Sequence, residues 1–443
     1  MSDWSTVTLA DIADIRFSNV DKKSLAGEKS VRLCNYMDVY LNSYITADLP
    51  FMEATATVWE MDRFKVEKGD NIITKDSETP DDIGIPAVVI DDIPNLICGY
   101  HLALIKPKRN KVDPIYLSKQ LGSRQSTIYF SRLANGSTRY GLSSSSIASI
   151  KIPLAPLVVQ RRIAEVLSTL DKAIEKTEAL IAKYQQIKVG LMHHLFTRGV
   201  TADGKLRPPR EQAPELYQET PLGWIPKDWE MTGLRAKAAP GIAHLRTGPF
   251  GSSLKGEHWV EEGHPVVTIG ALGESVFIES ELLYVTDCDA IRLSEFQLKL
   301  GDVVFSRVAD VGRSVVVRGK HVGWIMSSNL MRITLDKKRI IPDLLQQQLS
   351  YDHRLKQQIR AKVNSSGRDV ANSQTLNQLL FVWPAYDEQQ RIVELSAAID
   401  RRLRSEESKR EKLNKQKYGL MHDLLTGNVR VKPDAKLPGT AGG

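Results

Sequence analysis

The sequence contains little cysteine, and what it contains does not form a framework. Three cysteines, Cys34, Cys98 and Cys288, are spread over 443 residues, so they are odd in number and include no CxxC pair. This spacing excludes a disulfide scaffold and a cysteine-rich metal site, and it favours a reduced, cytoplasmic setting. No run of 18 apolar residues occurs, and no charged and then apolar leader follows Met1. We therefore expect neither export nor a membrane-spanning segment.

Signatures of catalysis are also missing. Amino methylation uses an Asn or Asp followed by two prolines and an aromatic residue, but Pro208-Pro209 is flanked by Arg207 and Arg210. The stretch Gly248–Glu257 is rich in glycine, yet it lacks the Gly-Lys-Ser/Thr ending of a phosphate-binding loop. We interpret this stretch as a turn or a DNA-facing loop. No catalytic residue, metal site or cofactor is expected in this chain.

Three helical histidines are a weak metal signal. His193 and His194 are adjacent in the sequence, so on a helix their side chains point about 100° apart and cannot both face one metal. With His422 they are interpreted as packing residues near helix ends.

Charge of neither sign dominates. The chain has 60 Lys and Arg against 53 Asp and Glu, a net charge of +7, which permits a polyanion partner without proving one. A hydrophobic content of 42% with 26% charged residues is ordinary for globular proteins, and 443 residues exceed a single core. Two or more domains are therefore expected.

One stretch of the sequence returns near its end. QRRIAEVLSTLD (Gln160–Asp171) recurs 229 residues later as QQRIVELSAAID (Gln389–Asp400). The register then holds without a gap to Thr197 and Thr426, with 14 identities over 38 aligned positions. This pattern indicates an internal duplication.

Each copy predicts one long helix with a heptad seam, as in a coiled coil. The second seam is polar in its middle, so Glu406 and Arg410 are expected to need groups from a partner helix. The residues chosen for pairing or partner contacts are Arg162, Ile163, Leu170, Ile174, Ile181, Arg391, Ile392, Ile399, Leu403 and Leu413. A homodimeric coiled coil with two fused domains is the alternative. The unbroken register between the copies favours antiparallel pairing within one chain, with a pseudo-two-fold axis.

The segments before the two helices share a plan, which predicts an α+β fold with two globular domains. The matching stretches are GDNIITK (Gly69–Lys75) with GDVVFSR (Gly301–Arg307), PIYLSKQLGS (Pro114–Ser123) with PDLLQQQLS (Pro342–Ser350), and the polar loops Asn135–Ser144 with Asn364–Ser373. Asp113-Pro114 predicts a helix start. The expected organisation is a domain at 1–151, a helix at 152–200, a domain at 201–381 with a linker-like lead-in at 201–222, a helix at 382–431 and a disordered tail at 432–443.

These residues resemble a known family. The duplicated helices ending in GLMHHLFT and GLMHDLLT, together with the GD stretches, are similar to the specificity subunit of type I restriction-modification enzymes. RTGPFGSSLK (Arg246–Lys255), after LGWIPKDWE (Leu222–Glu230), looks like the opening of that family's target-recognition domains; the first domain lacks a clear counterpart. The resemblance implies two target-recognition domains that read a bipartite, asymmetric site on double-stranded DNA. The helices would be spacers that hold two methyltransferase subunits carrying S-adenosylmethionine, and a restriction/translocase subunit would join the complex.

DNA contacts are expected from basic and polar residues at strand ends and in glycine-bearing loops. Arginine pairs bidentately with guanine, whereas lysine and hydroxyl groups more often bind phosphates. The residues selected are Lys75, Ser77, Thr79, Arg139 and Tyr140 in the first domain, and Lys255, Arg307, Arg313 and Arg368 in the second. For each of them a solvated surface residue is the competing interpretation. For the whole chain the competing function is a coiled-coil adaptor without DNA specificity.

Overall fold

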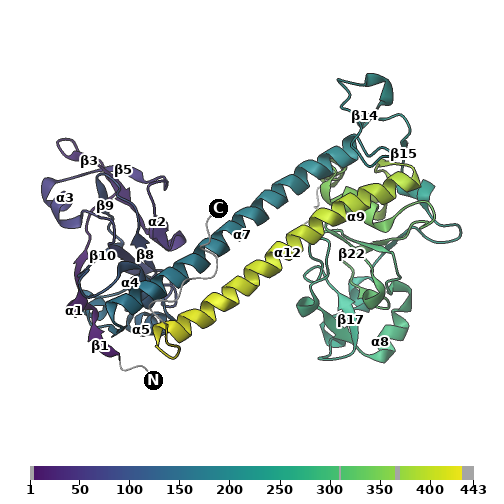
Figure 1. The fold of residues 1–443 in the computed structure, drawn as a ribbon. Coiled ribbons are helices and arrows are strands. Elements are labelled where there is room, and N and C mark those ends of the chain that lie inside the picture. The colour runs from purple at the N-terminus through teal and green to yellow at the C-terminus, as the bar shows by residue number, and fades with distance from the viewer. Residues whose placement is uncertain (1–3, 309–310, 365–369, 432–443) are drawn as a thin grey trace. The chain divides into compact units, whose positions relative to one another are not determined.

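A computed structural model of the chain describes residues 4–308, 311–364 and 370–431 (Figure 1). They fall into two compact units: unit 1 is Met1–Ala179 with Glu407–Gly443, and unit 2 is Leu180–Glu406. Two long helices, α7 (Leu157–Thr197) and α12 (Tyr386–Leu425), each contribute one part to each unit. The rest of each unit is a mixture of helix and sheet.

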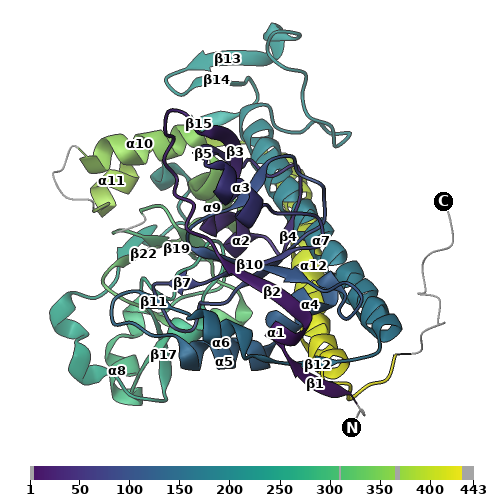
Figure 2. The same ribbon diagram turned by 90° about the vertical axis from the view of Figure 1, so that its left-hand side faces the viewer.

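Unit 1 contains a five-stranded and a three-stranded sheet (Figure 2). Its short elements are β1 (Ser5–Thr8), α1 (Leu9–Ile12), β2 (Ala13–Phe17), β3 (Lys29–Cys34), α2 (Tyr36–Leu41), β4 (Tyr44–Ile45), β5 (Met52–Ala56), α3 (Val58–Phe64), β6 (Asn71–Thr74), β7 (Asp76–Ser77), β8 (Pro86–Val89), β9 (Leu96–Cys98), β10 (Leu102–Pro107), α4 (Pro114–Leu121), α5 (Arg124–Leu133), β11 (Tyr140–Gly141), α6 (Ser144–Ala148) and β12 (Lys151–Leu154). The larger sheet has the order β2-β10-β6-β8-β4 and the smaller one β5-β3-β9. Separate two-stranded pairs join β1 to β12 and β7 to β11.

Unit 2 repeats most of this pairing pattern. Its short elements are β13 (Tyr217–Thr220), β14 (Gly223–Pro226), β15 (Glu230–Thr232), β16 (Leu245–Thr247), β17 (His264–Val267), β18 (Leu283–Val285), α8 (Asp287–Arg292), β19 (Val303–Ser306), β20 (Ser314–Val316), β21 (Ile325–Met326), β22 (Leu330–Ile333), α9 (Pro342–Tyr351), α10 (His353–Asn364), α11 (Ser373–Asn377) and β23 (Phe381–Trp383). The sheet with the strand order β16-β22-β19-β20 corresponds to the strands β2-β10-β6-β8 of unit 1. The strand β17 pairs antiparallel with β18 and parallel with β21, as β3 does with β5 and β9.

Alternating side chains give the larger sheet of each unit two buried faces. In unit 1, Ile73 packs in the core that contains α4 and α6, whereas Ile72 packs in the core shared with β3 and β9. In unit 2, Phe305 packs against α9 and Val304 against the β17 side. The central strands are therefore apolar at successive positions, because a strand buried on both faces shows no polar alternation.

A Gly-Asp turn leads into the central strand of both larger sheets. Gly69 and Gly301 have φ angles of 89° and 81°, a left-handed conformation that glycine adopts without strain. The next residues, Asp70 and Asp302, each accept a hydrogen bond at 2.8 Å from the backbone N–H three positions earlier. Burial raises the pKa of both carboxyl groups above the usual value. The repeated GD motif therefore encodes a repeated turn.

The helix predicted at Asp113-Pro114 is confirmed as α4. Asp113 is its N-cap, and the Asp113 carboxylate accepts hydrogen bonds from the backbone N–H groups of Ile115 and Tyr116, both at 3.0 Å. Pro114 at the first helical position needs no hydrogen-bond acceptor. The corresponding stretch of the second domain forms α9.

The glutamine that opens each repeated motif makes the same hydrogen bonds in both units. Gln160 accepts from the Asp113 backbone N–H at 2.8 Å and donates to the carbonyls of Lys111 and Ala155. Gln389 accepts from Ile341 N–H at 3.0 Å and donates to two carbonyls. Each glutamine is buried, so it fixes the first turn of its long helix to the loop before α4 or α9.

In unit 1 the end of α12 packs antiparallel to the beginning of α7. Leu424 and Leu425 share a core with Ile163 and Leu167. Nearer the middle of the helices, Lys417 pairs with Asp171 at 2.7 Å. In unit 1, later residues of α7 therefore contact earlier residues of α12.

Asp171 is a buried polar junction of unit 1. It accepts from Lys119 at 2.6 Å and from the Tyr44 hydroxyl at 2.7 Å, in addition to pairing with Lys417. Burial would raise the pKa of Asp171, but Lys119, Lys417 and Tyr44 together lower it below the usual 3.8. This group therefore stabilises the fold above that pH, and its contribution is lost as the pH falls further.

In unit 2 the end of α7 packs antiparallel to the beginning of α12. Lys188 pairs with Asp400 at 2.7 Å and lies over the Tyr351 ring at 4.8 Å. In the sequence repeat, Asp400 corresponds to Asp171 and Lys188 to Lys417, so both units use the same ion pair with the helices exchanged. Burial lowers the pKa of Lys188, but hydrogen bonds to Asp400 and Tyr351 outweigh it and raise the pKa overall.

The ten helix residues chosen for pairing or partner contacts are all buried or half-buried. Ile163, Ile181 and Ile392 are at most 5% exposed. Glu406 was expected to need a group from the partner helix, but it also pairs within α12, with Arg402 one turn earlier, at 2.8 Å. The heptad periodicity identified the buried face of each helix.

Replacing Asp400 by asparagine is expected to lower the free energy of unfolding of unit 2 by about 1 kcal/mol, since the pair is partly exposed. The loss should shrink in high salt. Because the pKa of folded Lys188 lies above 10.5, the contribution persists through neutral pH and is lost only as the pH rises beyond that value. Urea denaturation measures it, with Glu394→Gln, exposed on the same helix, as the control. Equal stability of the two variants would contradict this role, and the exchanged pair K188D/D400K should recover most of the loss.

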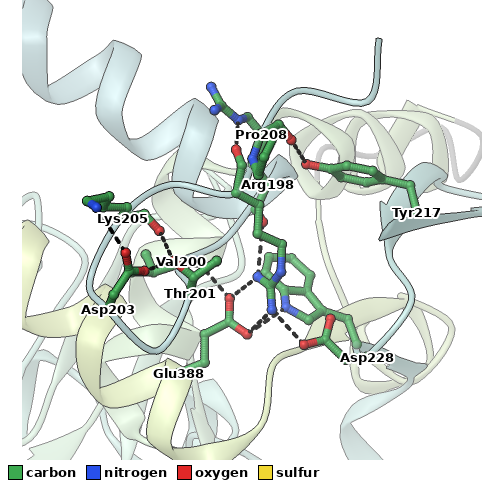
Figure 3. Close-up of polar contacts among 11 residues, drawn as sticks. Arg198, Val200, Thr201, Asp203, Lys205, Pro208, Tyr217, Asp228 and Glu388 are labelled. Carbon is green, nitrogen blue, oxygen red and sulfur yellow. Dashed lines mark hydrogen bonds and ion pairs between the residues drawn. The ribbon is translucent and has the colours of Figure 1, made fainter. Parts of the chain in front are cut away.

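The segment 201–222, interpreted as linker-like, has a fixed structure. It contains β13, which pairs with β14, and it is attached to unit 2 by a buried cluster around Glu388 (Figure 3). The Glu388 carboxylate accepts from Val200 N–H at 2.7 Å, Trp229 Nε1 at 3.1 Å and both terminal nitrogens of Arg207. Arg207 also donates to Asp228 at 2.6 Å. Although burial disfavours its charge, Glu388 and Asp228 raise the pKa of Arg207.

The backbone next to this cluster leaves no room for a side chain. Gly199 has a φ angle of 68°, and a Cβ atom there would lie 2.1 Å from the Glu388 carboxylate. Farther along, the Tyr217 hydroxyl donates to the Pro208 carbonyl at 2.6 Å. The chain after α7 is therefore held in place before β15 begins.

The three thiols are free. Cys34 and Cys98 are nevertheless register partners on the parallel strands β3 and β9, and both are fully buried. Burial raises the pKa of the Cys34 thiol well above its usual value. Within the described residues, no group of three or more His, Cys, Asp or Glu is placed to hold a metal ion. No helix in the same part of the chain is long and apolar enough to cross a membrane.

Candidate nucleic-acid interface

Four chain segments meet at one edge of the larger sheet in unit 1: those that follow β2 and β6, and those that precede β10 and α6. The strands β2 and β6 end there and β10 begins there, because β10 is antiparallel to both. At this edge, Lys75 N–H donates to the His101 carbonyl at 3.0 Å, Leu142 N–H donates to the Lys75 carbonyl at 2.8 Å, and Ser18 N–H donates to the Leu102 carbonyl at 3.3 Å. The loop after β6 is therefore tied to the loops before β10 and α6.

The corresponding edge of the larger sheet in unit 2 has a matching set of three backbone hydrogen bonds, and this shared set is called the backbone frame. Arg307 N–H donates to the Asn329 carbonyl at 3.0 Å, Ala371 N–H donates to the Arg307 carbonyl at 2.8 Å, and Gly248 N–H donates to the Leu330 carbonyl at 3.0 Å. Each bond matches one in unit 1. The backbone frame is thus shared, while the side chains that it carries differ.

The structure brings the predicted residues of the first domain together. Lys75, Ser77 and Thr79 lie on the loop after β6, and Arg139 and Tyr140 lie at β11, where Tyr140 and Ser77 are register partners. Arg139 and Thr79 are exposed, Tyr140 is half-buried, and Ser77 is 7% exposed. The pairing of β7 with β11 therefore joins two loops that are more than 60 residues apart in the sequence.

Lys75 is mostly buried within this group. Its ammonium lies 3.2 Å from Asp76 Oδ2 and 4.6 Å from the centre of the Tyr100 ring. His101 Nδ1 lies 2.9 Å from the same carboxylate oxygen. Asp76, Tyr100 and His101 were missed by sequence reasoning, which selected other basic and polar residues at strand ends and in glycine-bearing loops. The GYH triplet directly before a buried strand was the available signal.

The predicted residues of the second domain are more scattered. Arg307 is half-buried and braces two loops, donating to the Ser328 carbonyl at 2.9 Å and the Ala371 carbonyl at 3.1 Å. Burial lowers the pKa of Arg307 from its ordinary value. Lys255 is exposed on the loop after β16. The prediction for Arg368 lies outside the described residues.

Arg313 lies across the β19–β20 turn from Arg307. Its carbonyl accepts from Ser306 N–H at 2.8 Å, and its guanidinium donates to the Leu272 carbonyl at 2.8 Å. It also lines a cavity of about 380 Å³, together with Lys356 and Arg360. In the shared backbone frame, the second domain has Arg307 where the first has Lys75.

Residues 1–185 match the family model of the type I restriction modification DNA specificity domain. The type I restriction enzyme MjaX specificity subunit of Methanocaldococcus jannaschii is 25% identical over 345 residues, covering 76% of this chain and 73% of that protein. The MjaVIII specificity subunit of the same organism is 22% identical over 334 residues, covering 73% and 72%. The chain is thus similar to specificity subunits of type I restriction enzymes over about three quarters of its length, and its first 185 residues match the specificity-domain model.

Solved structures share the fold. The type I restriction-modification S subunit from M. genitalium aligns over 95% of this chain and 96% of its own, with a TM-score of 0.57 and 15% sequence identity. A chain from a structure that concerns complex assembly and conformational transition of the type I R-M system aligns over 96% and 98%, with a TM-score of 0.56 and 17% identity. The arrangement of mixed helix and sheet is therefore that of S subunits.

Proposed function

We propose that this chain reads a bipartite, asymmetric DNA site, with one half-site for each globular domain. The observation that carries the proposal is the shared backbone frame at one sheet edge of both units, centred on Lys75 and on Arg307. Two similar frames with different side chains suit two half-sites of different sequence. Base edges in the major groove present different donors and acceptors, so the side chains decide what is read.

Specificity subunits are the non-catalytic components of their complexes. We propose that two methyltransferase subunits dock on α7 and α12, one on each copy of the repeated helix. The matched ion pairs Asp171–Lys417 and Asp400–Lys188 support this arrangement, because they give both units the same local helix pairing. S-adenosylmethionine would then be held by the methyltransferase subunits, and a restriction/translocase subunit would complete the assembly.

A DNA-binding assay with and without the methyltransferase subunit tests the proposal. The assembled complex should retain DNA carrying its site in the presence of excess unrelated DNA, whereas an adaptor without DNA specificity would bind both equally. Retention that is the same for every sequence would contradict sequence reading. Calorimetric binding of S-adenosylmethionine to this chain alone would contradict the assignment of the cofactor to the partner.

Arg139 and Arg307 should affect different half-sites. Replacing Arg139 by alanine is expected to weaken discrimination at the first half-site by about 1 to 3 kcal/mol if it reads a base. Replacing Arg307 is expected to weaken discrimination at the second half-site by a similar amount, because the loops held by its guanidinium are released. Methylation of a library randomised in both half-sites measures both effects. An equal loss on all sequences would reassign these residues to phosphate contacts.

A further inference from the structure

We propose that Asp76 and His101 form the group that reads an exocyclic amino group of one base in the first half-site, that is, cytosine N4 or adenine N6. The inference rests on the proposed DNA-reading function and assigns residues within it. The carboxylate of Asp76 is the central observation, because a negative charge at a DNA-facing edge is repelled by phosphates unless it is neutralised and has a base to contact.

Only one oxygen of the Asp76 carboxylate, Oδ2, has neighbours that neutralise and orient it. Its Oδ2 atom lies 2.9 Å from His101 Nδ1 and 3.2 Å from Lys75 Nζ. The Tyr100 ring covers the ammonium of Lys75 and meets the His101 ring edge to face, with 4.9 Å between the centroids. In the described part of the chain, neither Asp76 Oδ1 nor His101 Nε2 has a hydrogen-bond partner.

The backbone keeps this carboxylate at the sheet edge. Asp76 belongs to β7, and its register partner on β11 is Gly141. A Cβ atom at Gly141 would lie 3.3 Å from Asp76 Oδ1, so glycine leaves the space beside that oxygen open. The side chains of Asp76 and His101 are 24% and 31% exposed, which is enough to meet a base edge without further movement.

The free oxygen of the Asp76 carboxylate is a hydrogen-bond acceptor. A carboxylate accepts hydrogen bonds only, so Oδ1 can accept from an amino N–H, while His101 Nδ1 lies 2.9 Å from the other oxygen, Oδ2. In the major groove, acceptors are complementary to the amino groups of cytosine and adenine, and a carboxylate contact to cytosine N4 is an established pairing. Guanine and thymine present acceptors at the corresponding positions and would be repelled.

The cleft beside His101 supports reading of a base in its duplex. It measures about 70 Å³ and is lined by Asp21, Lys22, Asn35, Tyr36, Tyr100 and His101. Pockets that enclose small molecules are typically several hundred cubic ångströms, so this cleft does not hold a base lifted out of the helix. Asp76 and His101 would therefore contact the edge of a base that stays paired in the duplex.

The second domain lacks this group. In the matched frame Lys75 corresponds to Arg307, so Asp76 corresponds to Val308, and His101 corresponds to Asn329. Valine has no acceptor. The pair of a carboxylate and an imidazole is therefore present in the first frame only, and this difference is one source of the asymmetry of the site.

The test uses the full chain assembled with its methyltransferase subunit. Asp76→Ala should reduce the preference at one base pair of the first half-site by about 5- to 150-fold, with the second half-site unchanged. His101→Gln should reduce the preference at the same base pair. Glu78→Gln is the matched control, since it removes an exposed negative charge from the same loop and should leave the preference unchanged. Methylation of a randomised library gives the preference at every position.

Probes that lack one amino group identify the base. Purine in place of adenine, or pyrimidin-2-one in place of cytosine, should weaken binding of the unmodified complex and leave binding of Asp76→Ala unaffected. Full discrimination by a folded Asp76→Ala complex would overturn the inference, as would a change of affinity that is equal on all sequences. If the unmodified complex shows no sequence preference, the proposed function itself fails.

Discussion

Replacing Glu388 by alanine is expected to lower the free energy of unfolding of unit 2 by about 3 to 5 kcal/mol. Arg207 would keep its buried charge with one carboxylate, that of Asp228, instead of two. Val200 N–H and Trp229 Nε1 would lose their acceptor. Chemical denaturation of the full chain measures the loss, and limited proteolysis at Lys205 should accelerate because the chain after α7 is no longer held.

The controls separate loss of the ion pair from general damage. Glu211→Ala removes a carboxylate from the same segment, but that side chain is 73% exposed and its removal should change stability by less than about 0.5 kcal/mol. The double variant R207M/E388L replaces the buried pair by apolar groups and should recover much of the loss, since burying charges is itself unfavourable. If Glu388→Ala were as stable as Glu211→Ala, the cluster would not hold the segment.

The long helices and their buried faces follow from the sequence because their signals are local. A heptad pattern fixes which side of a helix is apolar, and Ile163 and Ile392 are buried as that pattern requires. The Gly-Asp turns and the Asp113 cap are also local, since their hydrogen bonds join residues no more than three positions apart. Sequence periodicity and turn chemistry were sufficient for these parts.

The candidate site depends on contacts between distant residues, which the sequence does not show. Asp76 and His101 are 25 positions apart and meet because β6 and β10 are neighbours. Composition suggested a linker-like lead-in at 201–222, but it could not show that Arg207 binds Glu388, 181 positions away. The search for basic and polar residues selected Lys75 and Arg307 among others, and the side chains of these two bind other parts of the protein. Their neighbours Asp76, Tyr100 and His101 were overlooked because the sequence does not show that these residues meet Lys75.

We propose that α7 and α12 act as a ruler between the two half-sites. The helix α7 has 41 residues, so it is roughly 62 Å long at 1.5 Å per residue. This is longer than one turn of DNA, about 34 Å. Because the helices pair antiparallel in each unit, insertions must face each other to preserve the pairing. From the pairs Asp171–Lys417 and Lys188–Asp400, the positions after Ala179 and after Ser408 satisfy this condition.

Inserting one heptad at both positions should lengthen the DNA spacer by about three base pairs. Seven residues keep the seam in register and add about 10 Å, and base pairs are spaced about 3.4 Å apart. Both half-sites should be retained, because the reading loops are unchanged. Mapping of methylated sites measures the spacer. A control with three inserted residues in each helix rotates the seam out of register and should abolish site-specific methylation. If the heptad variant methylated the original site at full activity, the helices would be a docking platform that does not set the distance.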